Sequence, residues 1–221
     1  MNSLTEREKP LSPKTVKNIH GVLHAALKQA ATLHYIAYNP ADNTNLPRRV
    51  KPEMMVLDET STAAFLRAVE GHKYELLYKV TLFTGMREGE ALGLTWDRVS
   101  FDTGTILIDR QIQKEQKKGG QYRFVPPKND KARTIKPPLF VMQLLRTQRA
   151  RQAEQRLRAG DLWEDKGLVF TSESGGNIPV TTMYKDYKKV VESIGLPDLR
   201  FHDLRHPYVK HTTKKYSLQK Q

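Results

Sequence analysis

The chain has 221 residues, enough to bury a hydrophobic core, and no cysteine, which excludes disulfide frameworks, cysteine zinc sites and thiol nucleophiles and fits the reducing cytoplasm. Its 37 Lys and Arg against 24 Asp and Glu give a formal charge of +13, which favours a polyanionic partner, with nucleic acid ahead of an anionic membrane surface. No stretch approaches the roughly 18 uninterrupted apolar residues that a membrane-spanning helix needs, and the N-terminus lacks the apolar core of a signal peptide.

The N-terminal part is predicted to contain one long amphipathic helix. Ser12 is a suitable N-cap, Pro13 occupies the first helical position, and apolar residues follow at helical spacing to about residue 33. An Asn-Pro pair then ends the pattern. One long helix and a short one are roughly half of what a self-sufficient helical domain needs, so the N-terminal module is expected to be incomplete.

Proline and charge mark a linker at residues 47–56. We therefore predict two parts, a partial helical module in residues 1–50 and a larger domain in residues 51–221. The larger domain has the length of an ordinary self-sufficient fold.

The larger domain shows both helical and strand patterns. Asp58 is a candidate N-cap, and Gly85 is a candidate C-cap of a strongly apolar helix that should be buried. The predicted helices cover residues 58–70, 73–85, 87–99, 139–159 and 180–195, with a further one opening at 202, and the predicted strands cover 101–113, 122–127, 134–138 and 168–170. These patterns predict an α+β fold, mainly helical with a small antiparallel sheet.

Basic residues are concentrated in one part of the larger domain. Residues 110–159 hold 14 basic and three acidic residues, and the run coincides with paired glycines and the strand-like sequence YRFVPP. A lysine-rich surface in contact with water explains such a run equally simply. Its coincidence with turn and strand signals favours a presented basic hairpin, whose DNA affinity would depend steeply on salt.

Arg87 and Glu90 stand directly after the Gly85 turn in the sequence TGMREGEALGLTW. Their spacing places both on one face of a helix. An exposed ion pair is the ordinary interpretation of two such residues. The alternative is that a guanidinium held between a glycine turn and a helix recognises a phosphate through paired hydrogen bonds.

The sequence HDLRH places His202, Arg205 and His206 on neighbouring positions of one turn. A metal site would need a third ligand such as His211, but Pro207 disturbs that turn and no glutamate occupies a general-base position. Surface histidines without a function are a second interpretation. The third is a phosphate pocket, in which Arg87 and Arg205 bind one phosphodiester and His202 transfers protons near neutral pH.

TGMREGEALGLTWDRV, PPKNDKARTIKPP and HDLRH, in this order and spacing, resemble the tyrosine recombinases, the integrases of phages and integrative elements. The resemblance covers residues 56–206, and LSPKTVKNIHGVLHAALKQA with NPAD resembles the later part of their core-site-binding domain. It implies cleavage and rejoining of double-stranded DNA at attachment sites through a 3′-phosphotyrosine, with neither metal nor cofactor. It also implies assembly with full-length recombinase protomers on DNA, whereas we expect this chain to be a monomer without DNA.

The resemblance also assigns residues. Arg87, His202 and Arg205 match the phosphate pocket, and Glu90 matches a supporting acidic position. Lys128 matches the hairpin lysine that protonates the leaving oxygen, with Lys131 as the alternative because the loop blurs the alignment.

The family pattern is not matched after Arg205. The residues that follow are too polar for the expected helix, Pro207 replaces a small residue, and the usual nucleophilic tyrosine is not found. Tyr208 and Tyr216 are poor substitutes, because one adjoins the arginine's own turn and the other has no visible scaffold. Two hypotheses remain, a recombinase that acts as a longer product or with a complete partner, and an inert DNA-binding remnant or competitor. A metal-dependent nuclease is a weaker third.

Overall fold

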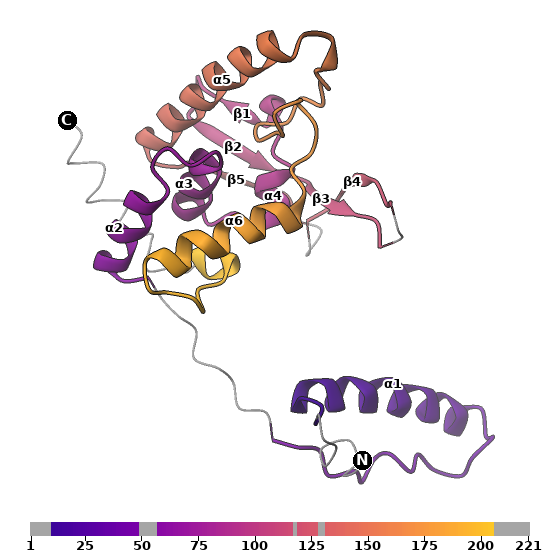
Figure 1. Cartoon of the computed structure of the whole chain (residues 1–221). Helices are drawn as coiled ribbons and strands as arrows, with labels where there is room; N and C mark the ends of the chain where they lie inside the picture. The colour runs from indigo at the N-terminus through magenta and orange to yellow at the C-terminus, as the bar shows by residue number, and fades with distance from the viewer. Residues whose placement is uncertain (1–9, 49–56, 117–118, 128–130, 206–221) are drawn as a thin grey trace. The chain divides into compact units, whose positions relative to one another are not determined.

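The structure is a computed structural model that describes residues 10–48, 57–116, 119–127 and 131–205 (Figure 1). The chain divides into two compact units, residues 1–53 and 54–221. Within the described ranges, no helix is long and apolar enough to cross a membrane.

The smaller unit contains helix α1 (Pro13–Thr32), which confirms the predicted N-terminal helix. The Ser12 hydroxyl accepts a hydrogen bond from the Thr15 amide at 3.2 Å and so caps the first turn. The segment after the helix returns along it, and two histidine side chains of α1 bond to it at Ala41 and Asp42. Most apolar side chains of α1 remain exposed, and Val16 is its one buried residue.

The larger unit is mainly helical with antiparallel strands, which confirms the predicted α+β class. Its α-helices are α2 (Glu59–Ala68), α3 (Glu75–Thr84), α4 (Glu88–Leu92), α5 (Leu139–Ala159) and α6 (Val180–Ser193), and its short 3-10 helices are η2 (Trp96–Arg98), η3 (Gly160–Leu162) and η4 (Phe201–Arg205). Helix α3 is central: it packs against α4, α5 and η4, and seven of its ten residues are buried. The buried helix that the sequence predicted is therefore the core of this unit.

The strands form two sheets, whereas the sequence predicted one. Strands β1 (Val99–Ser100), β2 (Thr105–Ile108) and β5 (Arg133–Ile135) pair antiparallel in the order β1-β2-β5, and β3 (Gln111–Lys114) pairs only with β4 (Tyr122–Val125) among the described strands. β5 pairs with the edge of β2 that β3 would occupy if β2 and β3 formed a continuous hairpin. β3 and β4 consequently project as a separate hairpin (Figure 1).

The projecting hairpin is held by a close backbone approach to α4. A Cβ atom at Gly93 would lie 2.7 Å from the Ile112 amide nitrogen, and one at Gly89 would lie 2.9 Å from the Ile112 carbonyl oxygen. Only glycine leaves room for the β3 backbone at these two positions. The hairpin is thereby attached to the helix that follows Arg87.

Three other predicted elements differ from the structure. The helix predicted at 87–99 ends at Leu92, because β3 and the C-cap Gly93 occupy its continuation. Residues 168–170 form a single bridge, Leu168 with Thr95, instead of a strand, because the facing chain turns into η2 directly afterwards. The last described element, η4, is a 3-10 helix, and residues beyond 205 lie outside the described ranges.

Phe201 connects η4 to the core. Its side chain is 1% exposed and packs against the rings of Tyr78, Tyr184 and Tyr187, with ring centroids 5.4–6.1 Å apart. Because three aromatic neighbours from α3 and α6 surround this ring, packing fixes its position. The residues that follow it, His202 and Arg205, are therefore placed by core packing.

Phe201→Ala should reduce the free energy of unfolding by about 3–5 kcal/mol, because it removes a buried aromatic ring and leaves a cavity. Urea denaturation followed by tryptophan fluorescence measures this, since both tryptophans, Trp96 and Trp163, lie in the larger unit. The matched control is Phe124→Ala, whose ring is 45% exposed and whose loss should cost less than about 1 kcal/mol. Equal losses in the two variants would contradict the anchoring role of Phe201.

Candidate functional site

The site begins at the turn between α3 and α4. Gly85 has φ +64° and ψ +23°, a left-handed conformation that costs other residues about 1–2 kcal/mol. Its amide donates to the Thr81 carbonyl and closes the last turn of α3. Arg87, two residues later, is the N-cap of α4. The glycine turn therefore determines the position of the Arg87 backbone, from which its side chain extends.

Glu90 holds Arg87 in place. The Arg87 amide donates to Glu90 Oε2 at 2.7 Å, and the Arg87 Nη1 donates to Glu90 Oε1 at 2.9 Å. The Glu90 side chain is fully buried, while that of Arg87 is 29% exposed. The pair is therefore more than the exposed ion pair that the spacing alone indicates.

A second arginine, Arg133 of β5, binds the same carboxylate from the sheet. Its Nη1 donates to Glu90 Oε1 at 2.9 Å and its Nη2 donates to Glu90 Oε2 at 2.6 Å. Burial opposes ionisation of Glu90, but the hydrogen bonds from Arg133 and Arg87 outweigh it and lower the pKa of Glu90 to about 2. The carboxylate is charged at every physiological pH.

η4 brings the second motif to the same turn. The Arg205 Nε donates to the Gly85 carbonyl oxygen at 2.7 Å, across 120 positions of sequence. Burial lowers the pKa of Arg205, and the positive charge of Arg87 lowers it further. The structure thus brings Arg87 and Arg205 together, as the phosphate-pocket interpretation requires.

His202 lies exposed on η4 beside these two cations. Partial burial lowers the pKa of His202 below its ordinary value, and the charges of Arg205 and Arg87 lower it further. Its imidazole is therefore mainly neutral at pH 7 and retains a nitrogen that accepts a proton. The buried Asp203 fixes the turn, because its carboxylate accepts three hydrogen bonds from Arg200 at 2.7–3.1 Å.

Two guanidinium groups and one imidazole around a glycine turn form a site for a tetrahedral anion. Arg87 and Arg205 each have N–H groups beyond those bonded to Glu90 and Gly85. Their two positive charges exceed the single negative charge of Glu90, a balance that suits an anionic ligand. In the described ranges, no group of three or more His, Asp or Glu side chains is placed to hold a metal ion.

Several predicted residues cannot be placed. Lys128, Tyr208 and Tyr216 lie outside the described residues, as do His206 and His211. Lys131, the alternative hairpin lysine, is described and exposed, two residues before Arg133.

Sequence reasoning did not find Arg133 or Arg200. Arg133 is one of 14 basic residues in its region, and nothing in its local pattern separates it from the others. Arg200 lies just before the HDLRH motif and three residues before Asp203. This spacing is typical of an ion pair on one helical turn and could have predicted the pair.

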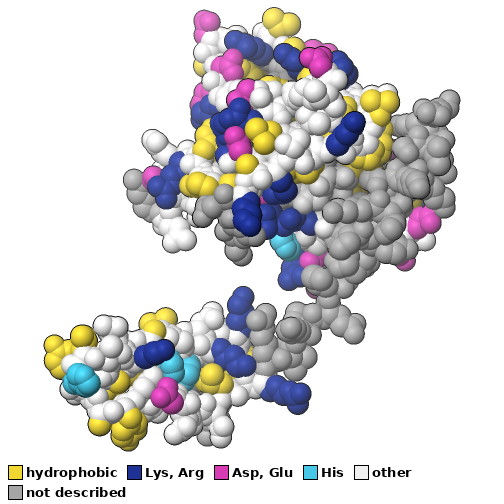
Figure 2. Space-filling view, turned by 180° about the vertical axis from the view of Figure 1, so that it is seen from behind, with side chains coloured by type: hydrophobic (Ala, Val, Ile, Leu, Met, Phe, Trp, Pro, Cys, Tyr) yellow, Lys and Arg dark blue, Asp and Glu magenta, His cyan; other side chains and the backbone are white. Residues whose placement is uncertain are grey.

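The β3–β4 hairpin carries a basic and aromatic surface. The Arg110 guanidinium lies 5.3 Å from the centre of the Phe124 ring, and the Lys114 ammonium lies 5.9 Å from that of Tyr122. Arg123 is exposed on the opposite strand. Figure 2 shows Lys and Arg side chains spread over the visible face of the larger unit, with Asp and Glu side chains among them.

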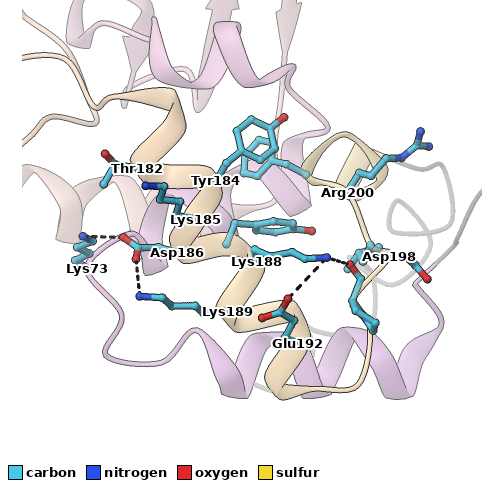
Figure 3. A pocket seen from close by; sticks show the side chains of 14 residues that line it. Lys73, Thr182, Tyr184, Lys185, Asp186, Lys188, Lys189, Glu192, Asp198 and Arg200 are labelled. Atoms are coloured by element: carbon cyan, nitrogen blue, oxygen red, sulfur yellow. Dashed lines mark hydrogen bonds and ion pairs between the residues drawn. The ribbon is translucent and has the colours of Figure 1, made fainter. Parts of the chain in front are cut away.

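A hollow of about 690 Å³ lies along α6 and the segment that leads into η4 (Figure 3). Its cations face acidic partners: Lys73 and Lys189 contact Asp186 at 2.7 and 3.8 Å, and Lys188 contacts Glu192 at 3.9 Å. Lys185 and Arg200 also line the hollow, so its five cations outnumber its three carboxylates, Asp186, Glu192 and Asp198.

A model of the phage integrase family matches residues 52–215. The chain therefore belongs to the phage integrase family. Among curated proteins, it is 28% identical over 213 residues to a tyrosine recombinase XerC-like protein of Caldanaerobacter subterraneus subsp. tengcongensis, a match that covers 89% of this chain and 54% of that protein. It is 25% identical to an integrase of Streptomyces ambofaciens, covering 93% and 54%. The chain spans about half the length of these relatives.

Solved structures share its fold. The Tn1549 transposon integrase in complex with a circular intermediate DNA has a TM-score of 0.76 and 20% identity, covering 94% of this chain and 69% of that one. A lambda integrase dimer bound to a COC′ core site has a TM-score of 0.58 and 16% identity, covering 94% and 55%. The predicted resemblance to tyrosine recombinases is confirmed.

The stability of the larger unit should depend on the ionisation of Glu90. Its pKa in the folded protein, about 2, lies below its ordinary value of 4.5, so ionisation stabilises the fold fully above pH 4.5. The difference corresponds to about 3 kcal/mol, which is lost progressively as the pH falls from 4.5 to 2. Urea unfolding of the wild type and of Glu90→Gln between pH 6 and pH 2 tests this. The difference between their free energies of unfolding should become smaller as the pH falls over that interval.

Asp165→Asn is the control, since its ion pair with Arg156 at 3.0 Å is exposed on both sides. It should change the free energy of unfolding by less than about 1 kcal/mol at either pH. A gap between the wild type and Glu90→Gln that stays constant down to pH 2 would contradict a buried, ionised Glu90.

Proposed function

We propose that this chain is the DNA-binding and phosphate-binding part of a site-specific DNA recombinase. The observation that carries the proposal is the hydrogen bond from Arg205 to the Gly85 carbonyl, because it joins the two arginine motifs into one pocket. Membership of the phage integrase family supports it. So do the DNA complexes in which integrases of the same fold were solved.

In the proposed reaction, Arg87 and Arg205 hold the scissile phosphodiester and offset the negative charge that grows on its oxygens as it becomes pentacoordinate. Glu90 keeps Arg87 in position. A tyrosine oxygen forms a bond to phosphorus while the bond from phosphorus to the 5′ oxygen breaks. The products are a 3′-phosphotyrosine and a 5′-hydroxyl, and the reverse sequence rejoins the strand.

Two protons move in this reaction. The ammonium of Lys128, or of Lys131, donates one to the departing 5′ oxygen. The imidazole of His202, kept neutral by its lowered pKa, accepts the proton that the attacking tyrosine hydroxyl loses. The proposed chemistry uses neither metal nor cofactor, and the tyrosine is not assigned to a described residue.

The remaining parts of the proposal concern partners and organisation. Residues 1–50 supply part of the module that binds the core site, and residues 51–221 bind the scissile phosphate. The chain acts in the cytoplasm on double-stranded DNA, beside full-length recombinase protomers, and is a monomer without DNA. The basic hairpin β3–β4 adds contacts to the phosphate backbone.

The chain should bind duplex DNA with an affinity that falls steeply with salt. Each phosphate contact contributes about 0.9 to the slope of log affinity against log salt, so Lys114→Gln or Arg123→Gln should each reduce that slope by about 1. Fluorescence anisotropy with a labelled duplex at several salt concentrations measures it, and sedimentation of the free protein, expected to show a monomer, gives the stoichiometry.

The control for the hairpin variants is Arg158→Gln at the far end of α5, where the side chain is 80% exposed. It should leave the salt slope unchanged. Absence of duplex binding by the wild type at low salt would overturn the proposed function. Equal slopes in all four proteins would remove the hairpin from the DNA interface.

The purified 221-residue chain should bind a nicked suicide duplex without forming a covalent adduct. The described tyrosines near the site are not free to attack the phosphate. Tyr78 and Tyr187 are buried in the core, and the Tyr184 hydroxyl donates to Glu88 at 2.6 Å. Burial and Glu88 also raise the pKa of Tyr184, which opposes formation of its phenolate. A denaturing gel measures the adduct.

A covalent adduct would contradict this expectation and show that the chain completes the first step by itself. Tyr208→Phe and Tyr216→Phe would then identify the attacking residue. If neither abolishes the adduct, Tyr184→Phe is the next variant.

A further inference from the structure

Arg133 of β5 reaches the Arg87–Glu90 pair from the sheet. Both its terminal nitrogens bond to the Glu90 carboxylate, at 2.9 and 2.6 Å, in a bidentate arrangement. Its backbone is held in register within the sheet, opposite Ile108 of β2. The guanidinium therefore approaches Glu90 from a fixed strand and not from a mobile surface.

Charge balance gives this contact a consequence for the pocket. Glu90 contributes one negative charge, while Arg87, Arg133 and Arg205 contribute three positive charges. With Arg133 present, Glu90 is neutralised from the sheet side and the charge of Arg87 remains available to an anion. Without Arg133, the same buried carboxylate has Arg87 as its nearest cation and competes directly with a phosphate for it.

The geometry distinguishes Arg133 from a group that binds the phosphate itself. Both its Nη atoms are engaged with Glu90, so its two-pronged face points into the protein. Arg87 instead uses one Nη atom and its backbone amide for Glu90, and keeps other guanidinium N–H groups for a ligand. Arg133 consequently acts through Glu90 on Arg87.

We infer that Arg133 is a positioning residue of the phosphate pocket, which balances the charge of Glu90 and leaves the Arg87 guanidinium free to bind the DNA phosphate. The inference rests on the proposed function, because it concerns how the same pocket binds DNA. It adds a residue of β5 to a site otherwise built from the α3–α4 turn and η4. The β1-β2-β5 sheet is then a functional support of the pocket.

Arg133→Gln should weaken binding of the labelled duplex about tenfold. The matched control is Arg98→Gln, because Arg98 is similarly exposed in the same unit and makes two hydrogen bonds to carboxylate oxygens, of Asp97 and Asp109, at 2.7 and 2.8 Å. That variant should bind within about twofold of the wild type. Circular dichroism confirms that each variant is folded before binding is measured.

The double variant Glu90→Gln/Arg133→Gln separates positioning from direct contact. It removes one charge of each sign, and the amide oxygen of the glutamine that replaces Glu90 still accepts a hydrogen bond from Arg87, so the double variant should bind the duplex at least about threefold more tightly than Arg133→Gln alone. An Arg133 that touched the phosphate directly would not be rescued, because its contact stays lost. A tenfold defect in both the single and the double variant would therefore overturn the inference.

A measurement without DNA supplies an independent readout. NMR titration of the Glu90 carboxyl should show its pKa about 1–3 units higher in Arg133→Gln than in the wild type. Arg133→Lys keeps the charge but loses the paired geometry, so the Glu90 pKa in this variant should lie between those of the wild type and Arg133→Gln. Arg133→Lys also replaces the glutamine variant in the test if that variant does not fold. An unchanged Glu90 pKa in either variant would overturn the inference.

The outcomes keep the inference distinct from the proposed function. A wild type that binds DNA together with an Arg133→Gln variant that binds equally well would defeat the inference alone. A wild type that binds no duplex at low salt would defeat the proposed function, and the inference with it.

Discussion

The Glu90 carboxylate is fully buried, and a buried charge is costly unless cations and hydrogen bonds surround it. Here an amide and two guanidinium groups meet that requirement. The three donors come from the start of α4 and from β5, so ionisation of one side chain fixes a turn, a helix and a sheet relative to one another. The position of Arg87 follows from that requirement.

The second half of the pocket depends on the main chain. Arg205 bonds to the carbonyl oxygen of Gly85, whose left-handed conformation ends α3. Phe201, buried among aromatic rings of α3 and α6, sets the position of η4. The pocket is thus connected to the hydrophobic core at both motifs, and its geometry shares the stability of the core. In the proposed function, a preorganised site of this kind would bind the phosphate without first having to order its own side chains.

Local patterns predicted much of the larger unit. The bounds of α5 and the cap residues Asp58 and Gly85 follow from short-range rules, and so they were found correctly. The division of the strands into two sheets was not predicted, since it depends on β5 pairing with β2 and on the β3 backbone packing against Gly93. Contacts between segments distant in sequence leave no local periodicity to read.

The sequence by itself determined the fold class, the excess of positive charge and the two arginine motifs, because these depend on composition and on spacing within single helices and turns. Tertiary structure alone decided that Arg205 bonds to the turn that precedes Arg87 and that Glu90 is buried. It also decided that Arg133, indistinguishable in sequence from its basic neighbours, bonds to that carboxylate. The physical reason is that burial and long-range pairing are properties of the packed chain, and they change what an identical side chain can do.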